Sequence, residues 1–305
     1  MLSAFPSRSS NVRASMSNCL VADSFFNMTT AASNKLFAPL QVGDVTLAHR
    51  VVMAPLTRFR ADDNHVHTDL ALQYYSQRAE APGTLLITEA TFISPEAGGY
   101  DHVPGIWSDE QIAAWKKARC RHFIFFPTMD WILQLWALGR AADPKVLARE
   151  GLPFVSSSAT PMEDGAPVPR ELSKDEIKRY VDTYVQAAKN AVLKAGFDGV
   201  EIHSANGYLL DQFLQDVCNK RTDEYGGSIE NRARFTLEVA DAVTAAVGAK
   251  RTGIRFSPWG KFQGMRMEDP VPTFSYVAKE LAKRHTDLAY VHFVEPVVAG
   301  DSDQK

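Results

Sequence analysis

Cysteine, long apolar runs and clustered basic charge are all scarce in this chain of 305 residues. Its three cysteines, Cys19, Cys120 and Cys218, are odd in number and lack the spacing of a metal site. This argues against a disulfide framework and favours a reducing compartment. No apolar run is long enough to span a bilayer, so we expect no membrane partner. Lysine and arginine are spread among acidic residues, which argues against a nucleic-acid partner.

The composition that remains is that of a globular protein. Hydrophobic residues make up 45% of the chain, and its formal net charge is -3. A chain of this length can bury a substantial core, either as one large α/β domain or as two small ones.

Residues 1–34 differ from the rest. They are rich in Ser, Asn and Ala, contain Arg8 and Arg13, and have no acidic residue before Asp23. These features are shared with organelle transit peptides, but the arginines are few and the amphipathic pattern is poor. We therefore expect a disordered extension on a cytoplasmic protein, with Met28 as a natural start just ahead of the ordered sequence.

Strand and helix patterns alternate beyond this extension. Ser173 and Glu176 form a capping box for one helix, and Gly196 lies where that helix should end. Other helices are expected over 69–80, 231–247 and 274–284, and strands over 51–54, 84–88, about 131–135, 199–203, 252–256 and 289–294. The repeated βα order and the right-handed crossover rule predict a parallel sheet that closes as a (β/α)8 TIM barrel. A doubly wound sheet is the alternative, but no Gly-x-Gly-x-x-Gly follows a strand.

The number of strands is smaller than a closed barrel needs. About six of the eight βα units are present, so residues 35–305 are expected to form an incomplete (β/α)8 barrel. A second irregularity lies near 118–132, where Pro127 interrupts any regular element and leaves the helix after the second strand in doubt.

The most informative segment of the chain begins at Gly199. It reads Gly-Val-Glu-Ile-His203-Ser-Ala-Asn206-Gly-Tyr208, so a strand ends on a histidine, with an amide and a phenol in the loop that follows. Parallel α/β folds carry their chemistry at this edge of the sheet. The chain then continues as Leu-Leu-Asp-Gln-Phe-Leu and later as Asn-Lys-Arg-Thr-Asp-Glu-Tyr-Gly-Gly-Ser-Ile-Glu-Asn-Arg-Ala-Arg-Phe235. This long string closely resembles the Old Yellow Enzyme family of flavin-dependent ene-reductases.

The resemblance extends over about residues 34–117 and 133–301 and implies an FMN enzyme that takes hydride from NADPH or NADH. Its substrate would be a small molecule with an activated C=C bond. His203 and Asn206 would donate hydrogen bonds to the substrate's carbonyl or nitro oxygen, as an oxyanion hole does. Tyr208 would supply the proton. A homodimer is an open alternative to a monomer.

The same resemblance implies a set of residues around the flavin and the substrate. The flavin would be held by Pro55, Leu56, Thr57, Ala90, Gln134, His203 and Arg255, and the substrate pocket would be formed by Trp136, His203, Asn206 and Tyr208. Without that resemblance, these residues have ordinary alternatives: local caps, core packing and a structural ion pair.

Two rival functions stay open. A chain that ends at Lys305 lacks the last two βα units of the family, so it is expected to retain FMN weakly. It could be an inactive paralogue or the product of a frame or splice error. The other rival is a metal-dependent hydrolase, because His65 and His67 form a His-x-His after the first strand. Their polar loop has no companion ligands at later strand ends, which favours a solvated loop and no metal.

Overall fold

The computed structural model describes residues 35–123, 129–296, 298–299 and 302–303, and the extension expected over 1–34 lies outside these ranges. Its main sheet has the strand order β11-β10-β9-β6-β4-β3, all parallel, and the short β5 pairs with the end of β6. The bounds are β3 Val52–Met53, β4 Leu85–Ile87, β5 Thr91–Phe92, β6 Asp130–Trp136, β9 Gly199–His203, β10 Thr252–Phe256 and β11 Tyr290–Phe293. The six predicted strands are therefore confirmed.

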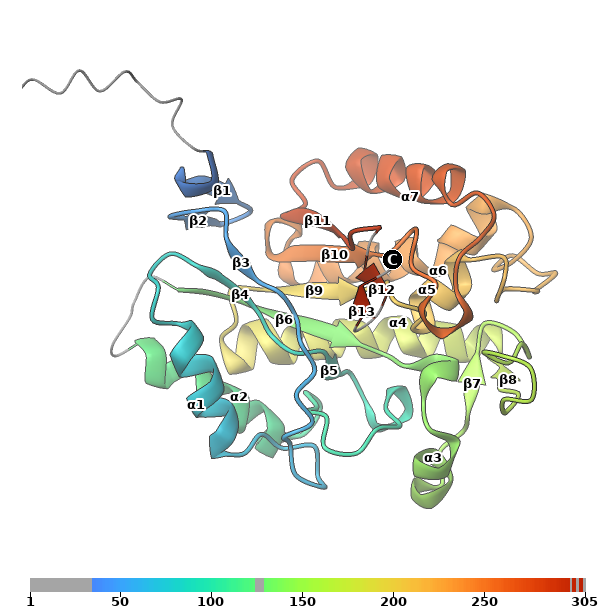
Figure 1. Ribbon diagram of the computed structural model, residues 1–305, viewed down its shortest axis with the longest axis horizontal. Helices are drawn as coiled ribbons and strands as arrows, with labels where there is room; N and C mark the ends of the chain where they lie inside the picture. The colour runs from blue at the N-terminus through green and yellow to red at the C-terminus, as the bar shows by residue number, and fades with distance from the viewer. Residues whose placement is uncertain (1–34, 124–128, 297, 300–301, 304–305) are drawn as a thin grey trace, which may run out of the picture. The chain divides into compact units, whose positions relative to one another are not determined.

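The longer helices cover the outer side of this curled sheet (Figure 1). They are α1 Asp69–Arg78, α2 Asp109–Phe123, α4 Lys174–Lys189, α6 Ile229–Val247 and α7 Val271–Arg284. The doubt about the helix after the second strand is resolved, because α2 is formed and ends at Phe123, ahead of Pro127. Residues 124–128, with that proline, lie outside the described ranges. Parallel strands with helices on the outside are the arrangement of an incomplete (β/α)8 barrel.

Helix α4 shows how local sequence sets a boundary. The Ser173 hydroxyl accepts from the Glu176 N–H, and the Glu176 carboxylate accepts from the Ser173 N–H. The helix passes into a π-helical turn over Asn190–Ala195, and Gly196 ends that turn with a left-handed φ of 87°. The predicted capping box and the predicted glycine stop are both confirmed.

Several short elements had no prediction from sequence. They are α3 Pro144–Glu150, α5 Leu209–Leu214, the hairpin of β1 Leu40–Val42 and β2 Val45–Leu47, the parallel pair of β7 Val155–Ser156 and β8 Arg170–Glu171, and the hairpin of β12 Val298–Ala299 and β13 Ser302–Asp303. The first hairpin packs Leu47 against Leu85, Ile87 and Ile132, near the N-terminal ends of the strands. Over the described ranges, no helix is both long and apolar enough to cross a bilayer.

The two faces of the sheet differ because side chains alternate along a strand. The outer face meets the helices through a core that includes Leu133, Leu135, Val200, Ile202, Ile254 and Phe256. The residues between them therefore point to the inner face, and these include Gln134, Trp136, Glu201, His203 and Arg255. The alternation thus brings polar groups from three strands into the interior of the curled sheet.

Candidate active site

The residues predicted for the site all lie at the C-terminal edge of the parallel strands, where the arrows of β6 and β9 point in Figure 1. Pro55, Leu56 and Thr57 follow β3, Ala90 follows β4, Gln134 and Trp136 lie at the end of β6, His203 ends β9, and Arg255 is the penultimate residue of β10. Barrel enzymes build their active sites at this edge. The predicted residues therefore share one location, and their roles in binding and catalysis stay a prediction.

Three aromatic side chains contact one another at this edge. The rings of Trp136 and His203 are stacked, with centroids 6.1 Å apart and planes at 21°. The Tyr208 ring meets both of them edge to face, at 4.7 Å from Trp136 and 5.0 Å from His203. Tyr100 also packs on Trp136, with centroids 5.9 Å apart. These contacts hold the imidazole and the phenol side by side without a hydrogen bond between them.

His203 is buried, and its Nδ1 has no hydrogen-bond partner among the described residues. Burial, and then the charges of Arg255 and His292, hold the pKa of His203 well below its usual range. The imidazole is therefore neutral at physiological pH and carries one N–H. A buried donor or acceptor without a protein partner calls for a ligand or a water molecule.

Asn206 lies in a tight turn that fixes its backbone. Its φ is 57°, a left-handed value that asparagine tolerates better than most residues. Its N–H donates to Ser257 Oγ at 2.6 Å, and its carbonyl accepts from Gln263 Nε2 at 2.8 Å. Gly207, also left-handed, donates its N–H to Asp211 at 2.8 Å. The backbone of the turn that carries Asn206 is therefore held on both sides.

Tyr208 precedes α5 and has an extended backbone, with φ -84° and ψ -179°. Burial, with a further contribution from Tyr100, raises the pKa of Tyr208 above its ordinary value. The phenol is therefore fully protonated at neutral pH and can act as a proton donor. Burial makes the phenolate of Tyr208 less favourable than that of a solvent-exposed tyrosine.

Polar groups also lie on the inner face below these rings. Gln134 is buried, and its Nε2 donates to Glu201 at 2.6 Å. Arg255 has a buried Nε with no hydrogen-bond partner among the described residues, and burial lowers the pKa of Arg255. Glu201 was not predicted from the sequence, although its position two residues before His203 on the same strand places both side chains on one face.

Arg140 is a further residue that the sequence did not identify. Its side chain is buried, and it donates to the carbonyls of Thr160, Pro161, Gln263 and Gly264 at 3.1, 2.8, 3.1 and 3.4 Å. The side chain therefore joins two loops, one of which also holds Asn206 through Gln263. Only long-range contacts reveal this role, because an arginine after a strand has no distinctive local pattern.

The expectation of a solvated His-x-His loop is wrong for His67. This side chain is buried, with its ring 4.0 Å from that of Trp115 and its Nε2 3.7 Å from Glu89. Burial lowers the pKa of His67 to about 3. His65 turns elsewhere and hydrogen-bonds through Nδ1 to the carbonyl of Val103 at 2.6 Å. The loop is polar in sequence, but the aromatic side chains of α1 and α2 cover its second histidine.

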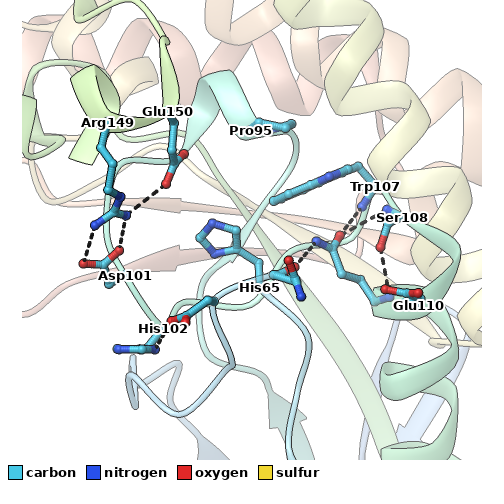
Figure 2. A pocket seen from close by; sticks show the side chains of 12 residues that line it. His65, Pro95, Asp101, His102, Trp107, Ser108, Glu110, Arg149 and Glu150 are labelled. Atoms are coloured by element: carbon cyan, nitrogen blue, oxygen red, sulfur yellow. Dashed lines mark hydrogen bonds and ion pairs between the residues drawn. The ribbon is translucent and has the colours of Figure 1, made fainter.

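A cavity of about 850 Å³ lies beside this loop, and none of the predicted site residues lines it. Figure 2 shows Arg149 between Asp101 and Glu150 at one wall and His65 and Trp107 at another. Phe92 contacts His65 on this side and Trp136 on the other. The cavity is therefore distinct from the site at the strand ends.

A curled parallel sheet with unsatisfied polar groups at the C-terminal edge defines an enzyme of the TIM-barrel class. Residues 35–305 match the model of the NADH:flavin oxidoreductase / NADH oxidase family. The chain therefore belongs to this family, and it is an FMN-dependent NAD(P)H oxidoreductase of the Old Yellow Enzyme type. The predicted family, incomplete barrel, enzyme class and cofactors are thereby confirmed.

Individual relatives agree with this assignment. The chain is 58% identical over 270 residues to the chanoclavine-I aldehyde reductase fgaOx3 of Penicillium roqueforti, which covers 88% of this chain and 72% of that protein. It is 52% identical over 262 residues to the probable inactive reductase easA of Epichloe festucae var. lolii, over 86% of this chain and 68% of that protein. The crystal structure of Old Yellow Enzyme from Pichia sp. AKU4542 superposes with a TM-score of 0.83 at 47% identity, covering 87% and 72% of the two chains.

The inner face is suited to the FMN that the family uses. His203 Nδ1 and Arg255 Nε are both buried, and no described residue pairs with either atom. The flavin ring system carries carbonyl oxygens and ring nitrogens, which would satisfy groups of this kind. The buried Ala90 at the same edge has a side chain small enough for a planar ring to approach closely.

Proposed function

We propose that this protein reduces the activated C=C bond of an α,β-unsaturated carbonyl or nitro compound with hydride from NAD(P)H. The observation that supports this most is the group of His203, Asn206 and Tyr208 behind one strand end. A neutral imidazole, whose buried Nδ1 has no partner among the described residues, lies there with the Asn206 amide and a protonated phenol. An alkene conjugated to an electron-withdrawing group needs these two functions, a polariser and a proton donor.

The roles of the side chains follow from their chemistry. His203 and Asn206 would each donate a hydrogen bond to the carbonyl or nitro oxygen, and so stabilise the negative charge that develops there. FMN, when bound, supplies the hydride to the β-carbon. Tyr208 would then transfer its phenolic proton to the α-carbon, which completes the reduction. Trp136 would form a wall of the pocket and hold the His203 and Tyr208 rings in place.

A second set of residues would hold the flavin. Arg255 would offset negative charge on the N1 and C2 oxygen side, and Gln134 would bind the pyrimidine edge. Thr57 would contact the C4 carbonyl side, with Pro55 and Leu56 beside it, and Ala90 would lie under the ring. The Arg58 N–H, next to Thr57, donates to Glu89 at 3.1 Å, which ties the loop after β3 to the residue preceding Ala90.

The substrate to test first is an unsaturated aldehyde, because one relative is named as an aldehyde reductase. The FMN-loaded protein should oxidise NADPH or NADH in the presence of such a compound. His203→Ala or Asn206→Ala should each slow alkene reduction by about a hundredfold, the usual effect of losing an oxyanion-hole donor. Both changes should also weaken the binding of a phenolate, which presents an oxygen anion to the same two donors.

A matched control is His285→Ala. This half-buried histidine follows the last residue of α7 and bonds to Asp241 at 2.7 Å. It is not among the predicted site residues, so its loss should leave turnover unchanged. The proposal is wrong if His203→Ala and Asn206→Ala retain full enone turnover. If the wild-type protein binds FMN but reduces no enal, enone or nitroalkene, the chain is instead an inactive member of the family. The Epichloe relative is named as a probable inactive reductase.

A further inference from the structure

Three basic side chains lie in one row across neighbouring strands. Arg255 on β10 is in register with His203 on β9 and with His292 on β11. Residues in register on parallel strands point to the same face, so all three belong to the inner face at one depth. The site prediction included His203 and Arg255 but not His292.

Glu201 lies one layer below this row. It is in register with Gly253, two residues before Arg255, and its side chain is fully buried. Both of its carboxylate oxygens have partners: Oε1 accepts from Gln134 Nε2 at 2.6 Å, and Oε2 bonds to His292 Nδ1 at 3.0 Å. A buried carboxylate needs such partners, because burial without them is very costly. The partners come from β6 on one side and β11 on the other.

Arg255 lies next to this carboxylate and yet does not pair with it. The charge of Glu201 acts on the guanidinium, since it opposes the lowering of the Arg255 pKa by burial. Within the described ranges, however, Arg255 forms no ion pair, and its buried Nε has no hydrogen-bond partner. Arginine and carboxylate form strong paired hydrogen bonds when geometry allows. Both oxygens of Glu201 bond instead to Gln134 and His292.

We propose that His292 is a positioning residue that keeps Arg255 free for the flavin by holding Glu201 away from it. The inference rests on the proposed role of Arg255 as a flavin ligand. An Nδ1–H on His292 donates to one carboxylate oxygen while Gln134 occupies the other. Without His292, one oxygen of Glu201 would lose its donor, and the Arg255 guanidinium, which lies close enough to respond to the charge of Glu201, would pair with it in place of the imidazole. A guanidinium paired with Glu201 would no longer be able to bind the flavin.

The test substitutes His292 in the full chain and measures FMN affinity by fluorescence quenching. His292→Phe keeps a planar ring but removes the donor, so it should raise the Kd for FMN by roughly tenfold to a hundredfold, the usual effect of losing a hydrogen bond to a charged group. His292→Gln retains a side-chain N–H and should stay close to wild type. His292→Leu replaces His292→Phe if the latter does not fold.

The decisive variant is the double substitution His292→Phe with Glu201→Gln. It removes the charge that would capture Arg255, so it should bind FMN more tightly than His292→Phe alone, whereas loss of packing at His292 would not be repaired in this way. Val291→Phe is the matched control, because it places the same ring on the neighbouring, outward-facing position of β11 and should not change the Kd.

A crystal structure of the flavin-free His292→Phe variant gives a readout that does not depend on cofactor binding. The inference predicts an ion pair between Glu201 and Arg255 in that structure. It is overturned if Arg255 remains unpaired there, or if the double variant binds FMN no better than His292→Phe. If the wild-type chain does not bind FMN, the crystal structure still decides whether His292 holds Glu201 away from Arg255. The role of Arg255 is tested separately, because Arg255→Ala should weaken FMN binding wherever the wild-type protein binds it.

Discussion

The substitution Tyr208→Phe separates hydride transfer from proton transfer. Phenylalanine keeps the ring that meets Trp136 at 4.7 Å and His203 at 5.0 Å, so the aromatic cluster should persist. Only the hydroxyl is lost, which costs at most one hydrogen bond, or about 0.5 to 1.5 kcal/mol of folding stability. Because the phenol is protonated at neutral pH, the substitution removes a proton that the wild-type protein can donate.

The expected effect on the reaction follows from that lost proton. Loss of a general acid typically slows the step that it serves by about a hundredfold to ten-thousandfold, which corresponds to about 3 to 5 kcal/mol of activation free energy. The oxidation of NADPH by the enzyme involves no proton transfer to the alkene, so this half-reaction should change little. Reduction of an enone should be slowed by the full factor of about a hundred to ten thousand. A nitroalkene should be affected less, since its nitronate is stable enough to leave before protonation.

Stopped-flow absorbance resolves the two half-reactions on one preparation. Wild type and Tyr208→Phe are each mixed first with NADPH and then, after reduction, with an enone or a nitroalkene. Equal slowing of both half-reactions would mean that the substitution disturbs the whole site. Undiminished enone reduction would mean that Tyr208 only packs against Trp136 and that another group delivers the proton.

Three further outcomes are expected. Burial raises the pKa of Glu89 from 4.5 to about 7, so folding favours the protonated carboxyl. The stability gained in this way is complete below pH 4.5 and is lost as the pH rises to about 7. Glu89→Gln should remove this decrease of about 3 kcal/mol in the free energy of unfolding, measured with urea across that pH range. Ser173→Ala should cost about 1 kcal/mol in the same assay by removing the cap of α4, and an unchanged midpoint would show that the cap is dispensable. Cys218 is buried and burial raises the pKa of its thiol, so peptide mapping should find it alkylated only after denaturation; rapid labelling of the native protein would contradict its placement.

Much of the fold could be predicted from local pattern. The six apolar runs became six parallel strands, and the capping box at Ser173 and Glu176 set the start of α4. The hairpin of β1 and β2 was missed because its strands have three residues each, too few for a clear alternation. The doubt about α2 arose from Pro127, which lies beyond the last residue of that helix and so does not break it.

The sequence by itself determined the family, through the long string that begins at Gly199, and it placed His203, Asn206 and Tyr208 together because they lie within six residues of one another. Only the tertiary structure decided that His67 is buried beneath Trp115 and that His292 reaches Glu201. The register between β9, β10 and β11 depends on the packing of the helices that connect these strands, which lie far apart along the chain. No local pattern carries that register, so no reading of the chain alone could show which charges meet inside the sheet.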